Sequence, residues 1–458
     1  MRRVAALVLV IVVVGGGAAA VALGPFAQLD RGESGDLEPL WTSDTQRDIQ
    51  TNHHKIGASA DGELILAPVA VPSGHESIAT TSDEGDQHTH DEHQHDHDHT
   101  GEGASGAENS DTETNIVSGA CELVSLGRNG SVDWAYGIPP ENCLAHAVTE
   151  PAFGDVTGDG RREIVFGTTE NAVVMLDQEG EEVRRIRTES YGHSRPTVAN
   201  VTTAPGPEIV SSDVRAHVVG ADRDGVVWRD SVEGTAYPAP IVADVTGGDD
   251  PEVVIVTNRR VVAFDTTGDR VWETDVGGWT ASIAPDASTL YVGGSSTVYA
   301  IDGATGDVDW DHSVDGRPTV GTVVKADASA AERSDDSEQQ SDGRSLVYVG
   351  RNGGNVLFLD ADSGELVRES ERLVDSARQT PAPVVGDLTG DGEREMVLVT
   401  NNGLVAVLDA ETGTVQARYQ TDIPIWVPVT LTDLNSDGAS EILVRLGDGR
   451  VLALSYTE

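Results

Sequence analysis

The sequence predicts an all-β fold: a single eight-bladed β-propeller of four-stranded antiparallel blades. Short apolar runs alternate with Gly- and Asp-rich turns along most of the chain. Only 4% of the residues are aromatic while 51 are glycine, which is typical of short strands joined by tight turns. Three nearly identical acidic loops and weaker copies of the same frame also recur, mostly at intervals of a little over forty residues. That period corresponds to one four-stranded propeller blade of about 40–45 residues.

The net charge of the chain indicates the environment in which it folds and the partners it can bind. Its 458 residues carry a formal net charge of −47 and include only two lysines, Lys55 and Lys325. Repulsion among so many carboxylates opposes folding at low salt, whereas molar salt shortens the Debye length to about 3 Å and screens it. The composition therefore favours an extreme-salt habitat and argues against nucleic acid as a partner. The alternative is an acidic surface made for a basic partner.

The N-terminus predicts a membrane segment. Met1-Arg2-Arg3 precedes an uncharged stretch, Val4 to Leu29, that is long enough to span a bilayer with the arginines inside. Residues 1–29 are expected to form a signal anchor and transmembrane helix, followed by a short linker over 30–38. The protein would then be a single-pass protein of the cell membrane with its propeller on the extracytoplasmic side. The alternative is secretion after signal cleavage near Ala18-Ala19-Ala20.

Three acidic loops define the repeat, at 155–163, 387–395 and 433–441. Each follows a strand-like run and leads straight into another. Residues 200–208 and 244–252 keep the same frame but lose the acidic pattern. The loops therefore mark equivalent positions in successive blades.

Each unit contains four strand-like runs, here called strands a to d. In the unit that holds the second acidic loop, strand a is expected over 381–386, strand b over 395–399 and strand c over 404–408. An Asp-x-x-x-Gly turn then leads to strand d, which carries a tryptophan in several units. These indoles are expected to pack between neighbouring blades rather than to form a binding site. They are Trp228, Trp272 and Trp310.

Two insertions and the chain ends complete the count of blades. A His- and Asp-rich insertion over 71–117, expected to be disordered, separates strands b and c of the first blade. A polar insertion over 327–344 interrupts the sixth. The chain stops after a strand c, Val451 to Leu454, while residues near Leu40 to Asp44 have the pattern of an orphan strand d. Pairing these runs, with the N-terminal strand over about 39–44, closes a ring over 39–458 and removes exposed sheet edges.

Two repeat families share these motifs. Residues 153–160, Phe-Gly-Asp-Val-Thr-Gly-Asp-Gly, resemble the FG-GAP repeats of integrin α-chain and VCBS-type propellers. Residues 300–310, Ala-Ile-Asp-Gly-Ala-Thr-Gly-Asp-Val-Asp-Trp, resemble the Ala-x-Asp-x-x-Thr-Gly-x-x-x-Trp repeat of quinoprotein-like, PQQ-type eight-bladed propellers. The first resemblance implies calcium in the loops between strands a and b. Both are specific for the fold and weak for function, since propellers host many activities.

The acidic loops also predict a chemistry. Oxygen-bearing side chains fall at positions 1, 3, 5 and 9 of the pattern and glycine at position 6, a spacing that curls a short loop around a hard cation. We expect Ca²⁺ to clamp the loops structurally; the alternative is an Asp-Gly turn on an acidic surface that needs no ion. The expected calcium residues, position 7 included, are Asp155, Thr157, Asp159, Arg161 and Glu163; Asp387, Thr389, Asp391, Glu393 and Glu395; and Asp433, Asn435, Asp437, Ala439 and Glu441.

A second metal-binding signal lies in the first insertion, where imidazoles alternate with carboxylates and polar residues between Gln87 and His99. This composition favours Zn²⁺, Ni²⁺ or Cu²⁺. No fixed spacing defines a closed site, so binding should be multiple and adaptable. The alternative is a solvated low-complexity insertion without a metal role. The histidines concerned are His88, His90, His93, His95, His97 and His99.

The same insertion lies in a loop between strands b and c, on the face of the ring that also carries the loops leading into each strand a. Several units place a large side chain on this face, seven residues before the loop frame. We expect these side chains to form a funnel that binds a ligand or receives metal from the His-rich insertion. The alternative is that they plug the channel. They are His193, Tyr237, Trp279 and Trp426, with His54 and His146 nearby.

The two cysteines, Cys121 and Cys143, suit the oxidising side of a membrane. Cys121 begins an expected strand and Cys143 lies just past its antiparallel neighbour, so we expect a disulfide between them. Two unpaired thiols are the alternative.

The chain lacks the common catalytic motifs. The chain contains no nucleophile elbow, P-loop or closed zinc motif. It also lacks the adjacent Cys-Cys pair typical of quinoprotein dehydrogenases, so PQQ is not expected as a cofactor. We expect a binding or scaffold module with an unidentified protein or glycan ligand. One alternative is a calcium-dependent polysaccharide lyase, for which Arg195 and Lys325 are the candidate bases. Another is a metal-capture or metal-delivery protein that works through the His-rich insertion.

Overall fold

The computed structural model describes most of the predicted propeller. The described residues are 34–45, 54–70, 121–144, 146–202, 205–248, 250–325, 344–375 and 379–458. The predicted anchor over 1–29, the His-rich insertion over 71–117 and nearly all of the polar insertion over 327–344 lie outside them. Within the described ranges no helix is long and apolar enough to cross a membrane, and the sole helical element is a 3-10 turn, Pro140–Asn142.

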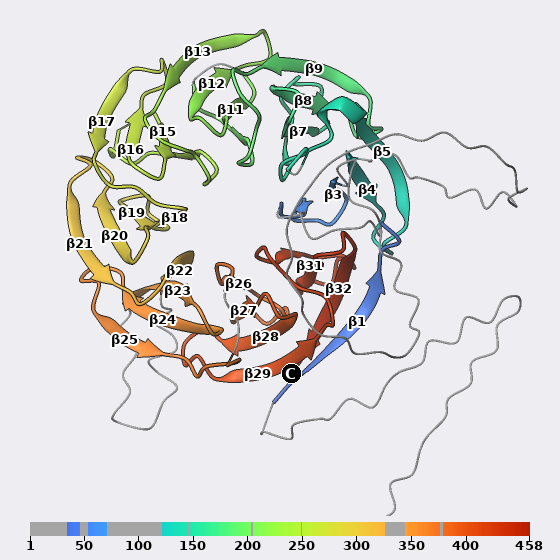
Figure 1. Ribbon diagram of the computed structural model, residues 1–458, viewed down its shortest axis with the longest axis vertical. Coiled ribbons are helices and arrows are strands. Elements are labelled where there is room, and N and C mark those ends of the chain that lie inside the picture. The colour runs from blue at the N-terminus through green and yellow to red at the C-terminus, as the bar shows by residue number, and fades with distance from the viewer. Residues whose placement is uncertain are drawn as a thin grey trace, which may run out of the picture. The chain divides into compact units, whose positions relative to one another are not determined.

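Residues 34–458 form one unit, in which eight four-stranded antiparallel sheets surround a central channel (Figure 1). The predicted eight-bladed propeller is therefore confirmed. Strand a of each blade lies nearest the channel and strand d forms the outer edge. The first four blades are β2 (Gly57–Ala58), β3 (Ile65–Ala70), β4 (Cys121–Leu126) and β5 (Val132–Ile138); β6 (Ala152–Gly154), β7 (Glu163–Thr168), β8 (Ala172–Leu176) and β9 (Glu182–Arg187); β10 (Thr197–Ala199), β11 (Glu208–Ser212), β12 (His217–Ala221) and β13 (Val226–Ser231); and β14 (Ile241–Ala243), β15 (Glu252–Val256), β16 (Val261–Phe264) and β17 (Arg270–Thr274).

The second half of the ring repeats this arrangement. Strand a has only three residues in five of the eight blades, so the loops leading into it form much of the channel wall. Blades 5 to 8 are β18 (Thr280–Ile283), β19 (Thr289–Gly293), β20 (Thr297–Asp302) and β21 (Val308–Ser313); β22 (Thr319–Lys325), β23 (Ser345–Arg351), β24 (Asn355–Asp360) and β25 (Leu366–Glu369); β26 (Val384–Gly386), β27 (Glu395–Val399), β28 (Leu404–Asp409) and β29 (Val415–Gln420); and β30 (Thr430–Thr432), β31 (Glu441–Arg445), β32 (Val451–Thr457) and β1 (Asp36–Thr42).

The first and last strands close the ring. β1 pairs antiparallel with β32, from Asp36 opposite Thr457 to Thr42 opposite Leu452, so blade 8 takes its outer strand from the other end of the chain. The predicted pairing is present, but β1 begins at Asp36 rather than near residue 39 and ends at Thr42 rather than at residue 44. The predicted linker is correspondingly too long, because Leu37 is already buried in the core.

The hydrophobic core lies between neighbouring blades. Strands b and c are continuous apolar runs, as expected for strands covered on both faces, and every residue of β15 and β16 is buried. The outer strand β13 is instead largely exposed. One cluster joins Val218 of blade 3 to Val253 and Phe264 of blade 4. Each blade therefore buries its apolar faces against the next blade.

Tryptophans of strand d join one blade to the next, as predicted. The Trp272 indole is 9% exposed and donates a hydrogen bond to the Gly303 carbonyl of blade 5 (2.7 Å). Its ring covers Gly306, which has a φ of +77° and where a Cβ would lie only 2.6 Å from the ring. Trp310 donates in the same way to the Ala361 carbonyl of blade 6 (3.0 Å). The Asp-x-x-x-Gly turn therefore receives the indole of the preceding blade.

Arginine takes the place of tryptophan at two other junctions. Arg184 of β9 donates to the Asp222 carbonyl of blade 3, and Arg368 of β25 donates to the Glu411 carbonyl of blade 7. Both carbonyls belong to the turn between strands c and d, which is the turn that an indole covers elsewhere. At these two junctions a guanidinium group therefore replaces the indole as the donor to the turn.

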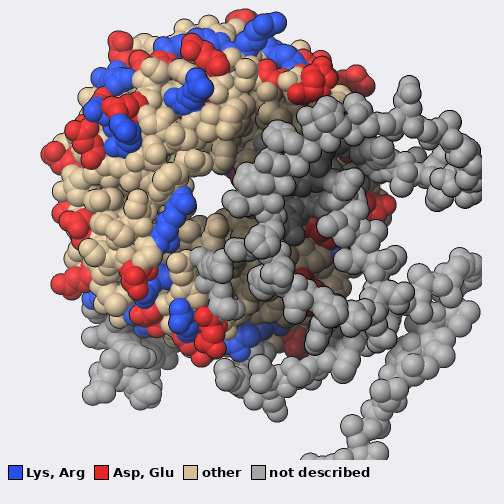
Figure 2. Space-filling view, in the orientation of Figure 1, with Lys and Arg blue, Asp and Glu red and all other residues tan. Residues whose placement is uncertain are grey.

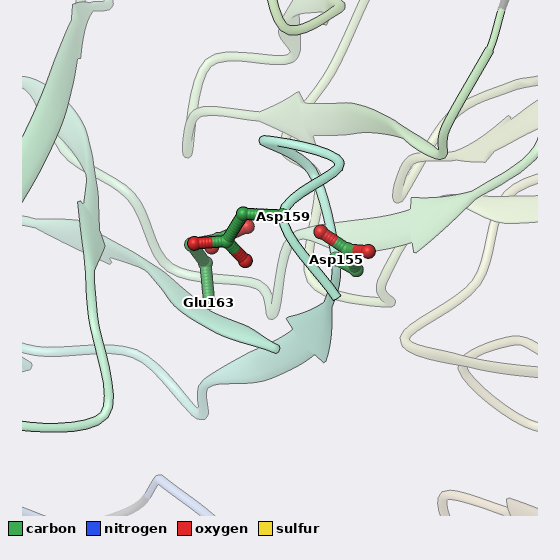
Figure 3. A group of neighbouring side chains, drawn as sticks. All are labelled: Asp155, Asp159 and Glu163. Carbon is green, nitrogen blue, oxygen red and sulfur yellow. The ribbon is translucent and has the colours of Figure 1, made fainter. Parts of the chain in front are cut away.

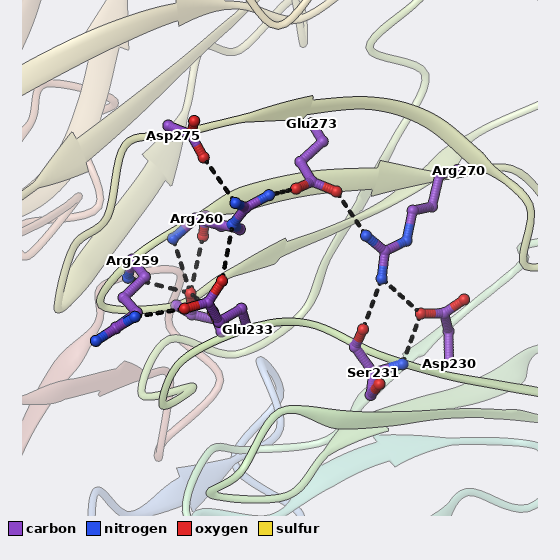
Figure 4. Close-up of polar contacts among 9 residues, drawn as sticks. Asp230, Ser231, Glu233, Arg259, Arg260, Arg270, Glu273 and Asp275 are labelled. Carbon is purple, nitrogen blue, oxygen red and sulfur yellow. Dashed lines mark hydrogen bonds and ion pairs between the residues drawn. The ribbon is translucent and has the colours of Figure 1, made fainter.

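A network of ion pairs joins the outer edges of blades 3 and 4 (Figure 4). Arg270 bridges Asp230 of blade 3 (2.9 Å) and Glu273 of its own blade (2.5 Å). Arg260 also pairs with Glu273 and approaches Glu233 of blade 3 (3.5 Å). Single exposed ion pairs contribute about 0–1 kcal/mol each. Because each of these basic groups already has acidic partners, the network belongs to the junction between blades and is not a binding site.

Candidate functional site

The strand directions give the ring two different faces. Every strand a runs from one face to the other, so the loops between strands a and b lie opposite the loops that lead into strand a. We call the first the acidic-loop face and define it by the loops 155–163, 200–208, 244–252, 387–395 and 433–441. The opposite face opens into a cavity, which we call the funnel.

The loop at 155–163 gathers its three carboxylates (Figure 3). Oxygens of Asp155, Asp159 and Glu163 lie within 4.8 Å of one another, the one such group of three acidic, histidine or cysteine side chains among the described residues. Asp155 accepts hydrogen bonds from the backbone N–H groups of Gly158 (2.8 Å) and Gly160 (2.9 Å). The backbone thus curls around its first aspartate, and the resulting cluster of oxygens suits a hard cation.

Glu163 has a second role, as a clamp on the start of the loop. Its Oε2 accepts the backbone N–H groups of Val156 (2.7 Å) and Thr157 (3.0 Å), and its Oε1 accepts the Thr157 hydroxyl (3.0 Å). Glu252 makes the equivalent three bonds in a loop that has lost the acidic pattern. The glutamate at position 9 therefore does not by itself indicate an ion. The other clamps are Glu208, Glu395 and Glu441.

The loops at 387–395 and 433–441 fold in the same way without forming so close a group of three carboxylates. Asp387 accepts the N–H groups of Gly390 (2.6 Å) and Gly392 (2.9 Å). In the other loop, Asp433 accepts equivalent backbone bonds from positions 4 and 6. Position 1 is therefore an aspartate that organises the loop backbone in all three cases.

Burial changes the titration of two clamps. It raises the pKa of Glu395 to about 7; Asp391 and Asp387 add to the rise, and the Leu388 N–H opposes it. Burial also raises the pKa of Glu441. A bound cation would favour the ionised form of such a carboxyl, so proton and cation would compete for it.

The other predicted calcium residues serve the loops in different ways. Thr157 and Asn435 donate to the clamps, whereas the Thr389 hydroxyl is buried and has no hydrogen-bond partner within the described ranges. Position 7 donates its backbone N–H to the aspartate at position 5 in each loop. The Arg161 side chain turns outward to pair with Glu179 (2.5 Å). The position-7 residues are Arg161, Glu393 and Ala439.

The funnel is a cavity of 1110 Å³ at the central channel. All six side chains predicted for it line this one cavity, and they come from six blades. Figure 2 shows the central opening surrounded mainly by uncharged atoms, with acidic atoms mostly toward the outer rim of the face in view. The six residues are His54, His146, His193, Tyr237, Trp279 and Trp426.

Five of these side chains form a continuous chain of ring contacts. The centroid distances are 5.0 Å between His54 and His146, 4.9 Å between His146 and His193, and 4.9 Å between His193 and Tyr237. The chain ends on Trp279, 4.7 Å from Tyr237. His54 and His193 are also 5.3 Å apart. Three imidazoles therefore form a triangle at one end of an aromatic wall.

Isolated β-bridges set the direction of three funnel side chains. In blades 3, 4 and 8, one residue of the incoming loop bridges to the residue just after strand b; these residues are Gly192, Ala236 and Ile425. The next residue in each blade is its funnel residue. Because successive side chains in an extended segment point to opposite sides, the bridge directs the following side chain into the channel.

His146 reaches the funnel by another route. In blade 2 the bridge is made by Val148, and the residue after it, Thr149, is buried and bonded within the blade. His146 precedes the bridge and has a φ of +65°, a left-handed conformation that is uncommon for residues other than glycine. The disulfide between Cys121 and Cys143 ties this loop to the start of β4.

Charged side chains that the repeat frame did not predict complete the lining. Lys55 and Arg195 approach Glu150, at 4.0 and 3.6 Å. Arg317 lies over the Trp279 ring, 4.1 Å from its centroid. The lining thus has three basic residues and one acidic residue, in a chain whose net charge is −47.

The repeat did not predict these charged residues because they do not occupy the repeated position seven residues before each loop. In blades 6 and 7 the frame position holds Thr319 and Thr380. Arg317, two residues before Thr319, and Gln379, one residue before Thr380, also reach the cavity. A sequence signal existed only for Lys55, which follows His54 and is one of two lysines in the chain.

The remaining predicted residues lie elsewhere. The candidate lyase base Arg195 lines the funnel, and Lys325 is the last residue of β22. The six histidines of the insertion, His88 to His99, lie outside the described residues.

Comparisons with known proteins agree on the fold. A PQQ-type repeat family model described as outer membrane protein assembly factor BamB matches residues 210–380. Among solved structures, BamB from Moraxella catarrhalis is 17% identical, with a TM-score of 0.55 over 92% of this chain and 97% of that chain. The computationally designed Ika8 protein is 12% identical, with a TM-score of 0.56 over 92% and 99%. The C-terminal WD40 domain of Sif2 is 16% identical, with a TM-score of 0.52 over 73% and 89%.

A comparison with curated proteins finds no match. At these identities the solved structures show a shared fold and no more. The matched family model supports the PQQ-type part of the resemblance. The chain is therefore a β-propeller with PQQ-type repeats that resemble those of BamB.

Proposed function

We propose that this chain is a membrane-anchored, extracytoplasmic propeller that binds a ligand in its funnel and acts as a binding or scaffold module. The observation that carries the proposal is the funnel, in which side chains from six blades surround one cavity. Concave sites with aromatic walls and a few placed polar groups are typical ligand sites. The anchor is the uncharged stretch over 4–29, whose flanking arginines favour a cytoplasmic N-terminus.

The charges of the lining favour a protein or glycan ligand that carries anionic groups. Guanidinium groups bind carboxylates through two parallel hydrogen bonds, and two of them, on Arg195 and Arg317, line the cavity. The acidic remainder of the surface repels an anionic ligand. The basic lining therefore distinguishes the funnel from the rest of the molecule.

The test is capture of the ligand from the native membrane. The full-length chain and an Arg195→Ala/Arg317→Ala variant are purified in parallel, and co-purifying proteins and uronic acids are quantified by mass spectrometry. We expect a species that the parent retains and the variant loses by about 10-fold or more, as for removal of charge-assisted bonds. The matched control, Arg223→Ala/Arg259→Ala, removes two exposed arginines outside the funnel. Equal retention by both variants would overturn the proposal.

The same purified protein can also be tested for enzymatic activity. The purified chain is incubated with a uronate polymer with and without Ca²⁺. Calcium-dependent cleavage that depends on Arg195 would replace the binding proposal by a polysaccharide lyase.

We also propose that Ca²⁺ clamps the acidic-loop face. Support comes from the close carboxylates of Asp155, Asp159 and Glu163 and from the buried, unbonded Thr389 hydroxyl among the described residues. In isothermal titration calorimetry, Asp159→Asn should remove one Ca²⁺ site, whereas Asp244→Asn, in a loop without the pattern, should not. Unchanged binding by Asp159→Asn would favour plain Asp-Gly turns.

The His-rich insertion is proposed to bind Zn²⁺, Ni²⁺ or Cu²⁺, as its composition favours. Deleting residues 87–99 should impair growth when one of these metals is limiting. Unchanged growth under each limitation would remove a role for the insertion in metal capture.

A further inference from the structure

Three histidines meet at one point of the funnel wall. His54 precedes β2, His146 precedes β6 and His193 precedes β10, so blades 1, 2 and 3 each supply one imidazole. The His54 Nε2 and His146 Nδ1 atoms are 3.2 Å apart. The three ring centroids are 5.0, 5.3 and 4.9 Å from one another. The rings therefore occupy the corners of a nearly equilateral triangle.

The separations of the ring centres match those of imidazoles that share one tetrahedral metal ion. With metal–nitrogen bonds of about 2.0–2.1 Å, two ligating nitrogens lie about 3.3 Å apart and their ring centres roughly 5 Å apart. Either ring nitrogen of a neutral histidine can ligate. His54 and His146 already have the required nitrogen separation. The His193 ring stands at the third corner, but the nitrogens of the three histidines do not yet lie within 4.8 Å of one another. Metal binding therefore requires the His193 ring to turn a nitrogen toward the other two.

The surrounding structure restrains two of the three histidines. His54 is 7% exposed, and His146 lies in the loop that the Cys121–Cys143 disulfide ties to β4. A plain hydrogen bond between His54 and His146 would explain their 3.2 Å separation. It would not explain why the ring centre of a third imidazole lies within 5.3 Å of both. The left-handed backbone at His146 is also unfavourable for a residue other than glycine, and a ligand bond would offset that cost.

The charges nearby permit a cation at this point. Lys55 and Arg195 both approach the Glu150 carboxylate, which partly neutralises them. The net charge of −47 also attracts cations to the molecule as a whole.

We propose that His54, His146 and His193 bind one divalent transition-metal ion, of the Zn²⁺, Ni²⁺ or Cu²⁺ type, with a fourth position open to the funnel. Imidazole suits these ions, and three protein ligands with one open position is the arrangement that lets a bound metal accept a further group. That group is a carboxylate of the funnel ligand, and in this respect the inference rests on the proposed function. Metal binding itself does not require the ligand.

The test uses the full-length chain with the six insertion histidines, His88 to His99, replaced by glutamine so that they do not compete. Co²⁺ is the probe, because its visible absorption distinguishes tetrahedral from octahedral ligation. We expect one equivalent of tetrahedral Co²⁺ that Zn²⁺ displaces. His146→Gln should weaken binding by more than about 100-fold and His193→Gln by at least about 10-fold, since loss of a ligand exceeds loss of an outer partner. The matched control, His312→Gln on the outer strand β21, should bind like the parent.

Two results would overturn the inference: no stoichiometric Co²⁺ binding by the parent, or equal binding by the parent and His146→Gln. Circular dichroism verifies that each variant folds, and His54→Gln replaces His146→Gln if the latter does not. Capture of the membrane ligand by chelator-treated protein separates the two proposals. Capture without a Co²⁺ site removes the metal inference alone, whereas a Co²⁺ site without capture removes the proposed ligand function alone.

Discussion

The acidic-loop face and the funnel belong to the same blades, but their residues follow opposite rules. On the acidic-loop face, equivalent positions hold the same residue for the same reason: Glu163 and Glu252 make identical bonds although only one of their loops keeps the acidic pattern. In the funnel, equivalent positions hold His193, Tyr237 and Trp426. The backbone has the same bridge at these three positions, whereas the side chains differ.

The difference separates scaffold from site. A side chain that recurs from blade to blade has a structural role in every blade, such as clamping a loop or covering a turn. A side chain that lines a cavity and differs between equivalent positions has no structural role common to all blades. It is therefore available for binding. This comparison implies that truncations on the acidic-loop side reduce stability, whereas truncations in the funnel reduce binding.

The largest effect is expected from the junction tryptophans. Trp272→Ala removes a buried indole and its bond to the Gly303 carbonyl, and should lower the free energy of unfolding by about 3–5 kcal/mol. Trp426→Ala truncates the same residue type in the funnel and should cost less than about 1 kcal/mol while weakening ligand capture. Urea denaturation followed by circular dichroism measures both. Similar losses in the two variants would erase the distinction.

The disulfide should rank second. Replacing both Cys121 and Cys143 by serine opens a covalent loop with a sequence separation of 22 residues, and should lower the free energy of unfolding by about 3 kcal/mol. Hydrogen exchange should then rise in the loop that carries His146 and stay unchanged at the Asp-x-x-x-Gly turns. A rise spread evenly over the ring would contradict a local role for the disulfide.

The clamp offers a smaller and sharper comparison. Glu252→Ala leaves two backbone N–H groups and the Thr246 hydroxyl without their acceptor, and should cost about 2 kcal/mol. Asp250→Ala, exposed in the same loop, should stay within about 0.5 kcal/mol of the parent. Both are measured by urea denaturation. Equal effects would show that Glu252 is ordinary surface charge.

The smallest effect is a dependence on pH. The pKa of Glu395 is raised to about 7 in the folded chain, so in the calcium-free protein its contribution to stability is full below its unfolded pKa. That contribution is lost as the pH rises from about 4.5 to about 7. The free energy of unfolding of the parent should fall by about 1–2 kcal/mol more than that of Glu395→Gln over this range. Saturating Ca²⁺ should reduce the difference if the 387–395 loop binds the ion, because the cation favours the carboxylate. Parallel pH profiles would contradict the raised pKa.

Features that repeat were predictable from the sequence. The acidic frame gave the number and order of the blades, the orphan run at Leu40 and Trp41 gave the closing strand, and Trp272 was correctly placed between blades. Each of these features depends on a local sequence pattern, because a residue with the same structural role in every blade recurs at the same position of every repeat.

Features that depart from the repeat were harder to predict from the sequence. His146 lies off the frame because its blade makes the bridge with Val148 and buries Thr149, and only the tertiary path of the loop brings it to His54. Arg317 reaches the cavity from two residues before the frame position, where no periodic signal marks it. The double role of Glu163, as clamp and possible ligand, depends on where its two oxygens point, which residue spacing does not specify.

The pairing of β1 with β32 has a consequence for how the protein is made. Contacts within and between the first seven blades are relatively local, so those blades can assemble as the chain emerges. Blade 8 alone must wait for the final strand, because its outer strand is made first and its neighbour last. Until then the nascent ring carries unpaired edges on both sides of a gap, the kind of surface that recruits foreign strands. The interval between synthesis of β1 and arrival of β32 is thus the period in which unpaired strand edges are most exposed to aggregation.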